Sequence, residues 1–241
     1  MKLAIALVLL LAAGDAAAQT LGLGDLGKPG PLVSGRIIQI VAVLSALSIA
    51  PSLLVMLTSF TRIVVALSFL RSGLGLQSTP ANIIMVSLAL FMTFHVMEPT
   101  FEKAYADGVT PLMEAKIDEK EAFSRIVEPF RAFMMKNVRD KDLRTMEELA
   151  ARGTTPAPTD KPELRNLIPA FMMSELRRGF EIGFLIALPF LVIDMIVATL
   201  TMSMGMMMMP PTVIALPIKV LFFILMDGWN LLVASVIRSY S

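Results

Sequence analysis

The sequence predicts an all-α, membrane-associated protein in which two kinked apolar helical hairpins flank a polar helical insert. Hydrophobic residues make up 56% of the 241 residues, and the mean hydropathy is +0.72. Soluble domains contain roughly 45–50% apolar residues, so a membrane protein is the first interpretation. Most charged side chains fall in one central region, and prolines interrupt the apolar stretches on either side. The predicted segments are residues 1–18, 19–35, 36–97, 98–165 and 166–241.

Residues 1–18 have the pattern of a secretory signal peptide. Met1 and Lys2 precede an apolar run over residues 3–13, and three alanines at 16–18 fit a small-residue cleavage site. An uncleaved first membrane helix is the alternative, but this run is shorter than the ~20 residues that a span needs. The mature chain then starts outside the cytoplasm, with a flexible, Gly- and Pro-rich lead-in over residues 19–35.

Residues 36–97 form the first predicted hairpin. The apolar stretch 37–60 is long enough to span a bilayer, and Pro51 is expected to kink it. A second apolar helix is expected over residues 82–97. Arg62 and Arg71 follow the first stretch, so the positive-inside rule places them in the cytoplasm and the insert in the periplasm. Arg177 and Arg178 then fall outside, against the rule.

Residues 98–165 interleave both signs of charge and are expected to be a solvated periplasmic insert. Apolar residues at helical spacing predict an amphipathic helix within it. Its aromatic members, which we predict to be an assembly face, are Phe123, Phe130 and Phe133.

Residues 166–241 form the second predicted hairpin, broken by Pro189 and by a Met-rich turn over residues 205–211. Five glycines are expected to interrupt the helices or to let them pack closely: Gly73, Gly75, Gly179, Gly183 and Gly205. Four consecutive methionines cannot lie on one helical face, so they predict an irregular, deformable apolar constriction. A loosely packed hydrophobic turn is the alternative. These residues are Met206, Met207, Met208 and Met209.

Four ionisable residues lie in or beside the apolar stretches, where a charge is costly unless it meets a partner or water. We expect them to make buried polar contacts within an assembly. Placement at the interface, with the charged tip reaching water, stays open, above all for the first of them. The four are Arg62, Asp194, Lys219 and Asp227.

Several function classes lack support in the sequence. There is no cysteine, the single histidine is His95, and no nucleotide-binding motif or nucleophile–base pair occurs. The formal net charge of +1 gives no indication of a nucleic-acid partner. We therefore predict no enzymatic activity, no cofactor, no metal site and no nucleic-acid binding.

Two blocks resemble signature segments of the FliP/SctR family, which provides the P subunit of type III export gates. They are residues 51–62 (PSLLVMLTSFTR) and residues 215–229 (ALPIKVLFFILMDGW). Shorter resemblances occur in order along nearly the whole mature chain: Thr79-Pro80, Glu98-Pro99, Leu188-Pro189-Phe190, Ile193-Asp194 and residues 205–211. The signal peptide favours the flagellar branch of the family.

The resemblance implies the core pore-forming subunit of the flagellar export gate, through which unfolded flagellar proteins are threaded. It implies about five copies assembled with smaller Q and R subunits in the flagellar basal body. The assembly is a helical cone on the periplasmic side of the inner membrane, lifted largely out of the lipid bilayer. The family's pore gasket falls on Met206, Met207 and Met208, whereas Met209 stands where relatives have a small aliphatic residue.

Two other readings stay open. A proton- or solute-coupled membrane transporter would use Asp194, Lys219 and Asp227 as coupling residues. An intramembrane enzyme would need a nucleophile and a base, for which His95 offers no convincing partner.

Overall fold

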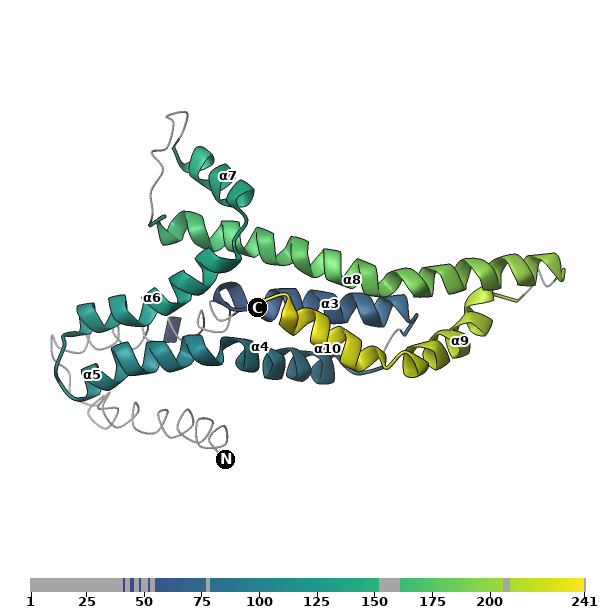
Figure 1. The fold of residues 1–241 in the computed structure, drawn as a ribbon, viewed down its shortest axis with the longest axis horizontal. Coiled ribbons are helices and arrows are strands. Elements are labelled where there is room, and N and C mark those ends of the chain that lie inside the picture. The colour runs from purple at the N-terminus through teal and green to yellow at the C-terminus, as the bar shows by residue number, and fades with distance from the viewer. Residues whose placement is uncertain are drawn as a thin grey trace, which may run out of the picture. The chain divides into compact units, whose positions relative to one another are not determined.

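The computed structural model describes residues 55–76, 79–151, 161–205 and 209–240, together with Val41, Leu44, Ser45, Ser48 and Ser52 (Figure 1). The predicted signal peptide and lead-in, Pro51, and Met206 to Met208 lie outside the described residues. The chain divides into two compact units, Met1–Leu53 and Leu54–Ser241. In the first, the Ser48 hydroxyl donates to the Leu44 carbonyl at 2.8 Å, a helical spacing. Everything that follows concerns the second unit.

The regular elements in the described part of this unit are all helices, which confirms the predicted all-helical class. They are α3 (Phe60–Gly73), α4 (Asn82–Ala104), the π-helix η2 (Tyr105–Val109), α5 (Thr110–Met113), α6 (Glu119–Asn137), α7 (Asp140–Ala150), α8 (Leu164–Ser203), α9 (Pro211–Leu225) and α10 (Gly228–Arg238).

Two helices are longer than the sequence pattern suggested. The apolar helix expected to end at residue 97 continues through Pro99 to Ala104. The stretch expected to be interrupted at Pro189 is one helix of 40 residues, α8. A proline removes one backbone hydrogen bond but need not end a helix whose neighbours hold it in place.

Close packing of α3 on α8 depends on two glycines four residues apart (Figure 1). A Cβ atom added at Gly179 would lie 3.0 Å from Val65 Cβ, and one at Gly183 would lie 2.6 Å from Phe69 Cβ. Any larger residue would push the helices apart, so the close packing predicted for these two glycines is confirmed. Gly75 and Gly205 instead have positive φ angles, and an added Cβ at Gly205 would meet no atom within 4 Å.

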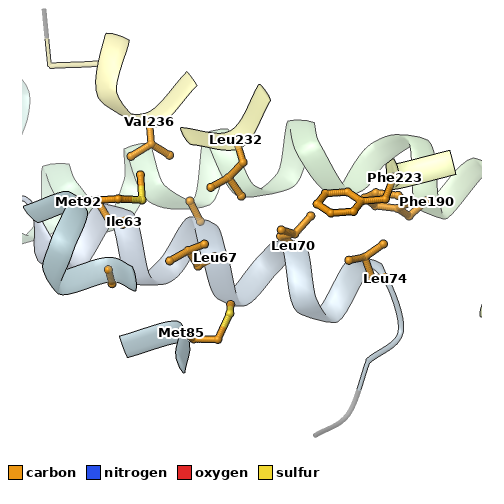
Figure 2. Close-up of a cluster of buried hydrophobic side chains, with 12 residues drawn as sticks. Ile63, Leu67, Leu70, Leu74, Met85, Met92, Phe190, Phe223, Leu232 and Val236 are labelled. Carbon is orange, nitrogen blue, oxygen red and sulfur yellow. The ribbon is translucent and has the colours of Figure 1, made fainter. Parts of the chain in front are cut away.

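The larger apolar core lies where α3 meets four other helices. Figure 2 shows Ile63, Leu67 and Leu70 of α3 surrounded by side chains from α4, α8, α9 and α10, namely Met85, Met92, Phe190, Phe223, Leu232 and Val236. A second cluster forms where α6 meets α8 and comprises Met134, Val138, Leu167, Ala170 and Phe171. The polar segment, residues 98–165, thus has its own apolar contact with the apolar helices.

Two helical stretches in the described residues are long and apolar enough to cross a membrane. They are Asn82–Met113, of 32 residues, and Leu164–Ser203, of 40 residues. The pair Pro211–Leu225 and Gly228–Arg238 passes the same test together but is bent by 64° at its break. Many large apolar side chains on these helices are exposed in the single chain. Contact with lipid or with other subunits would cover them.

Candidate functional site

A fully buried ion pair joins α3 to α8. The side chains of Arg62 and Glu175 are both 0% exposed. Arg62 Nε donates to Glu175 Oε2 at 3.1 Å, and Arg62 Nη2 donates to Glu175 Oε1. Two parallel bonds match the planar guanidinium to the planar carboxylate, which is the strongest geometry for such a pair. Arg62 therefore does not reach water and finds its partner within its own chain.

Ser239 and Tyr240, which follow α10, complete this pair. Arg62 Nη1 donates to the Ser239 carbonyl at 3.0 Å and to Ser239 Oγ at 2.8 Å. The Arg62 guanidinium carbon lies 3.7 Å from the centre of the Tyr240 ring, a cation–π contact. The Tyr240 hydroxyl donates to Glu175 Oε2. We call Arg62, Glu175, Ser239 and Tyr240 the junction cluster.

Tyr240 is a hydrogen-bond donor within the junction cluster. Burial, followed by the negative charge of Glu175, raises the pKa of Tyr240 well above its ordinary value. The phenol therefore remains a hydrogen-bond donor to the carboxylate at any physiological pH. With the guanidinium on one side and the hydroxyl on the other, the Glu175 carboxylate has partners for both of its oxygens, as a buried carboxylate requires.

A second ion pair joins α9 to α8 and α3. Lys219 Nζ donates to Asp194 Oδ2 at 2.6 Å and to the Gly73 carbonyl at 3.0 Å. The Lys219 side chain is 6% exposed, whereas that of Asp194 is 37% exposed. Both residues line a cavity of about 810 Å³ together with Arg71 and several hydroxyl side chains. We call Lys219 and Asp194 the open pair.

The turn between α8 and α9 presents methionines to the outside of the chain. α8 ends at Ser203, and Gly205 has φ +73°, a left-handed conformation that favours glycine. Met204 and Met209, on either side of the undescribed residues, are exposed. The predicted gasket residues Met206, Met207 and Met208 lie outside the described residues. The described chain ends at Gly205 on the α8 side and resumes at Met209, just before α9 (Pro211–Leu225).

Asp227 does not join either buried pair. It sits at the break between α9 and α10, with φ +50°, and its carboxylate accepts a hydrogen bond from Asn230 Nδ2 at 2.5 Å. Its side chain is exposed in the single chain. The neighbouring Gly228 permits the sharp bend, since a Cβ there would lie 2.1 Å from the Phe223 ring. Asp227 therefore lies at a helix break in the single chain. If it also contacts another subunit, it does so from this position.

The three phenylalanines of the predicted assembly face lie in different surroundings. Phe130 packs edge-on against Phe101 of α4, with ring centres 5.8 Å apart. Phe133 packs against both Phe171 and Tyr240. Phe123 is 68% exposed. Of the three, Phe123 is thus the side chain most available to a partner subunit.

Sequence reasoning did not single out Glu175 or Tyr240. A signal for Glu175 was present, because it is four residues before Gly179 and eight before Gly183, on the face of α8 that approaches α3. No comparable local pattern marks Tyr240, which reaches Arg62 only through the tertiary fold. Among the described residues, no group of three or more His, Cys, Asp or Glu side chains could hold a metal ion.

The fold and these pairs define a helical protein with segments able to cross a membrane, whose buried charges are neutralised between helices. The model of the FliP family matches residues 43–236 of the chain. The chain belongs to the FliP family, as the resemblance of residues 51–62 and 215–229 indicated.

Curated relatives agree across most of the chain. The protein named flagellar biosynthetic protein FliP from Rhizobium meliloti is 59% identical over 209 residues, which cover 86% of this chain and 85% of the relative. Its namesake from Agrobacterium fabrum is 59% identical over 210 residues, covering 87% and 86%. That of Bacillus subtilis is 46% identical over 203 residues, covering 84% and 91%.

Proposed function

We propose that this chain is a core pore-forming subunit of the bacterial flagellar type III export gate, through which unfolded flagellar proteins are threaded. Membership of the FliP family, whose relatives are named flagellar biosynthetic proteins, is the observation that carries the proposal. The subunit acts in the inner membrane, with residues 98–165 on the periplasmic side, as part of the flagellar basal body. About five copies assemble with the Q and R subunits into a helical cone.

The exposed apolar surface of the chain supports assembly. Large apolar side chains remain exposed on α4, α8 and α9. The chain also bends sharply between α9 and α10. Such surface is unstable in water and must meet lipid or other subunits. In a cone lifted from the lipid, neighbouring subunits cover it and also satisfy the polar groups at the bend beside Asp227.

The turn between α8 and α9 is the proposed seal of the pore. Methionine is unbranched and polarisable, so several such side chains can repack around differing polypeptides without sequence specificity. A ring of apolar side chains also excludes water and ions when no polypeptide is present. Met206, Met207, Met208 and Met209 from several copies would converge on the pore axis, held by α8 and α9 on either side.

A coupled transporter is the second candidate, and the open pair favours it. A partly exposed carboxylate next to a buried ammonium, at the wall of a cavity of about 810 Å³, can bind a proton or a small solute. Asp227 does not line that cavity, so the coupling role would rest on Asp194 and Lys219 alone.

Native mass spectrometry of the chain co-expressed with the Q and R subunits tests the assembly. We expect a discrete complex with about five copies of this chain plus both partners. A stable monomer or dimer that binds neither partner would overturn the export-gate proposal. Proton uptake by vesicles containing the chain alone would then support the transporter, provided that Asp194→Asn abolishes it.

Ion conductance tests the seal. Replacing Met206, Met207 and Met208 with alanine should open a leak through the assembled gate, because alanine is too small to fill the constriction. The matched control replaces three exposed methionines elsewhere, Met113, Met173 and Met195, and should leave conductance at the parent level. Equal conductance for both triple variants would refute the seal.

A further inference from the structure

Tyr240 contacts the polar segment and the apolar helices at the same time. Its ring stacks on Phe133 of α6, with ring centres 5.9 Å apart and planes at 23°. The same ring lies over the Arg62 guanidinium of α3, and its hydroxyl donates to Glu175 of α8. One side chain therefore joins three helices that are far apart in the sequence.

The backbone beside Tyr240 strengthens the same junction. Lys136 of α6 lies with Nζ 3.4 Å from the Tyr240 carbonyl. The Tyr240 hydroxyl is also 3.3 Å from the Ser59 carbonyl, immediately before α3. Contacts from both the side chain and the main chain thus converge on residues at the end of α6 and the beginning of α3.

The space around Tyr240 is otherwise incompletely filled. Tyr240 and Lys136 line one cavity of about 470 Å³ with Arg178 and Glu181, and another of about 320 Å³ with Pro99 and others. Both pockets are open to solvent. Tyr240 thus lies at the border of two open pockets beside the end of α6.

We propose that Tyr240 is a clasp that positions the polar segment on the apolar helices. The ring holds α6 through Phe133, while the ion pair beneath it fixes the ring in place. The remaining attachment of the polar segment to α8 includes the Phe133–Phe171 contact and the hydrogen bond from Ser174 Oγ to Asp142 Oδ2 at 2.7 Å. Those contacts hold the near ends of α6 and α7, and Tyr240 restrains the direction in which α6 leaves the junction.

Distance measurement between two spin labels tests the clasp. The chain has no cysteine, so cysteines introduced at the exposed Ser124 of α6 and Arg177 of α8 are the only labelling sites. In the full chain in detergent, we expect Tyr240→Leu to widen the distance distribution at least about twofold. Tyr240→Phe keeps both ring contacts and should leave the width at the parent value.

The other tyrosine of the chain provides a matched control. Tyr105 is 59% exposed, so Tyr105→Leu makes the same chemical change without touching the junction and should leave the width unchanged. Phe133→Leu removes the stack on Tyr240 together with the contact to Phe171, so it should widen the distribution at least as much. An unchanged width in this variant overturns the proposal even if Tyr240→Leu yields no folded protein. An unchanged width in the folded variants at Tyr240 and Phe133, or equal widening by Tyr105→Leu, overturns the proposal.

Discussion

Two ion pairs connect α8 to other helices, and they differ in whether a charged group remains accessible to a binding partner. The junction cluster is closed: Arg62 and Glu175 have no exposed surface, and their polar atoms are satisfied by each other and by Ser239 and Tyr240, so three segments distant in sequence meet there. The open pair is half closed, since Lys219 is buried but the Asp194 carboxylate faces a cavity. α8 therefore carries one acidic side chain, Glu175, that is fully buried and another, Asp194, that is partly exposed.

This difference in exposure suits the two ion pairs to different roles. A closed pair fixes how helices of one chain meet, because it is stable only when all its partners are present. A half-open pair retains an acceptor that a proton, a solute or another subunit can use. The open pair is thus the better candidate for contacts between subunits, and the junction cluster for the fold of the single chain.

Breaking the junction cluster should have the largest effect. Arg62→Met leaves the Glu175 charge buried without its cation, and we expect a loss of about 3–5 kcal/mol in the free energy of unfolding. The measurement is denaturant unfolding in detergent micelles, followed by circular dichroism. The double variant Arg62→Met, Glu175→Met removes both charges and should recover most of the loss. A double variant as unstable as the single one would contradict this account.

Breaking the open pair should cost less. Lys219→Met removes hydrogen bonds to a carboxylate and a carbonyl, worth about 1.5–3 kcal/mol, but the Asp194 carboxylate can turn toward the cavity and water. The same unfolding measurement checks the value. A loss equal to that of Arg62→Met would show that the open pair is as closed as the junction cluster, and the comparison would fail.

Removing one hydroxyl from the junction cluster should have a smaller effect again. Tyr240→Phe deletes a single donor to Glu175, whose carboxylate keeps both bonds from Arg62, so we expect a loss of about 1.5 kcal/mol, the lower end for a bond to a charged group. The change should largely disappear in the background of Glu175→Gln, because the charged acceptor is gone. Additive losses in the double variant would show that the hydroxyl acts independently of Glu175.

Breaking an exposed ion pair on α8 should have the smallest effect on the free energy of unfolding. Arg177 Nε donates to Glu181 Oε1 at 2.9 Å, with both side chains more than half exposed. Arg177→Gln should change the free energy of unfolding by less than about 0.5 kcal/mol, and added salt should reduce even that. Unfolding curves at low and high salt measure it.

The helical class and the apolar stretches could be predicted because hydropathy and periodicity are local properties of the sequence. The continuity of α8 could not, since Pro189 predicts a break and only the packing of α8 on α3 decides otherwise. The close approach at Gly179 and Gly183 was predicted, because an absent side chain is visible in the sequence. Its partner positions, Val65 and Phe69, required the structure.

The sequence predicted most of the charged residues of the candidate site, but not which of them pair with one another. Arg62, Asp194 and Lys219 are conspicuous in apolar surroundings, yet nothing local says that Asp194 meets Lys219 while Arg62 meets Glu175. Asp227 looked like the others but occupies a helix break, where its left-handed backbone rather than its charge distinguishes it. Pairing is a property of the tertiary fold, so composition identifies the participants and leaves the partners open.

The length of α8 has a consequence for where its two halves can lie. Its 40 residues extend about 60 Å at 1.5 Å per residue, twice the ~30 Å of hydrocarbon in a bilayer. The first half carries Glu175, Arg177, Arg178 and Glu181, whereas Asp194 is the one ionisable residue over 182–203. The first half therefore belongs in water or in protein. α8 is one continuous helix, so a tilt imposed beside the junction cluster would also displace its far end at Ser203.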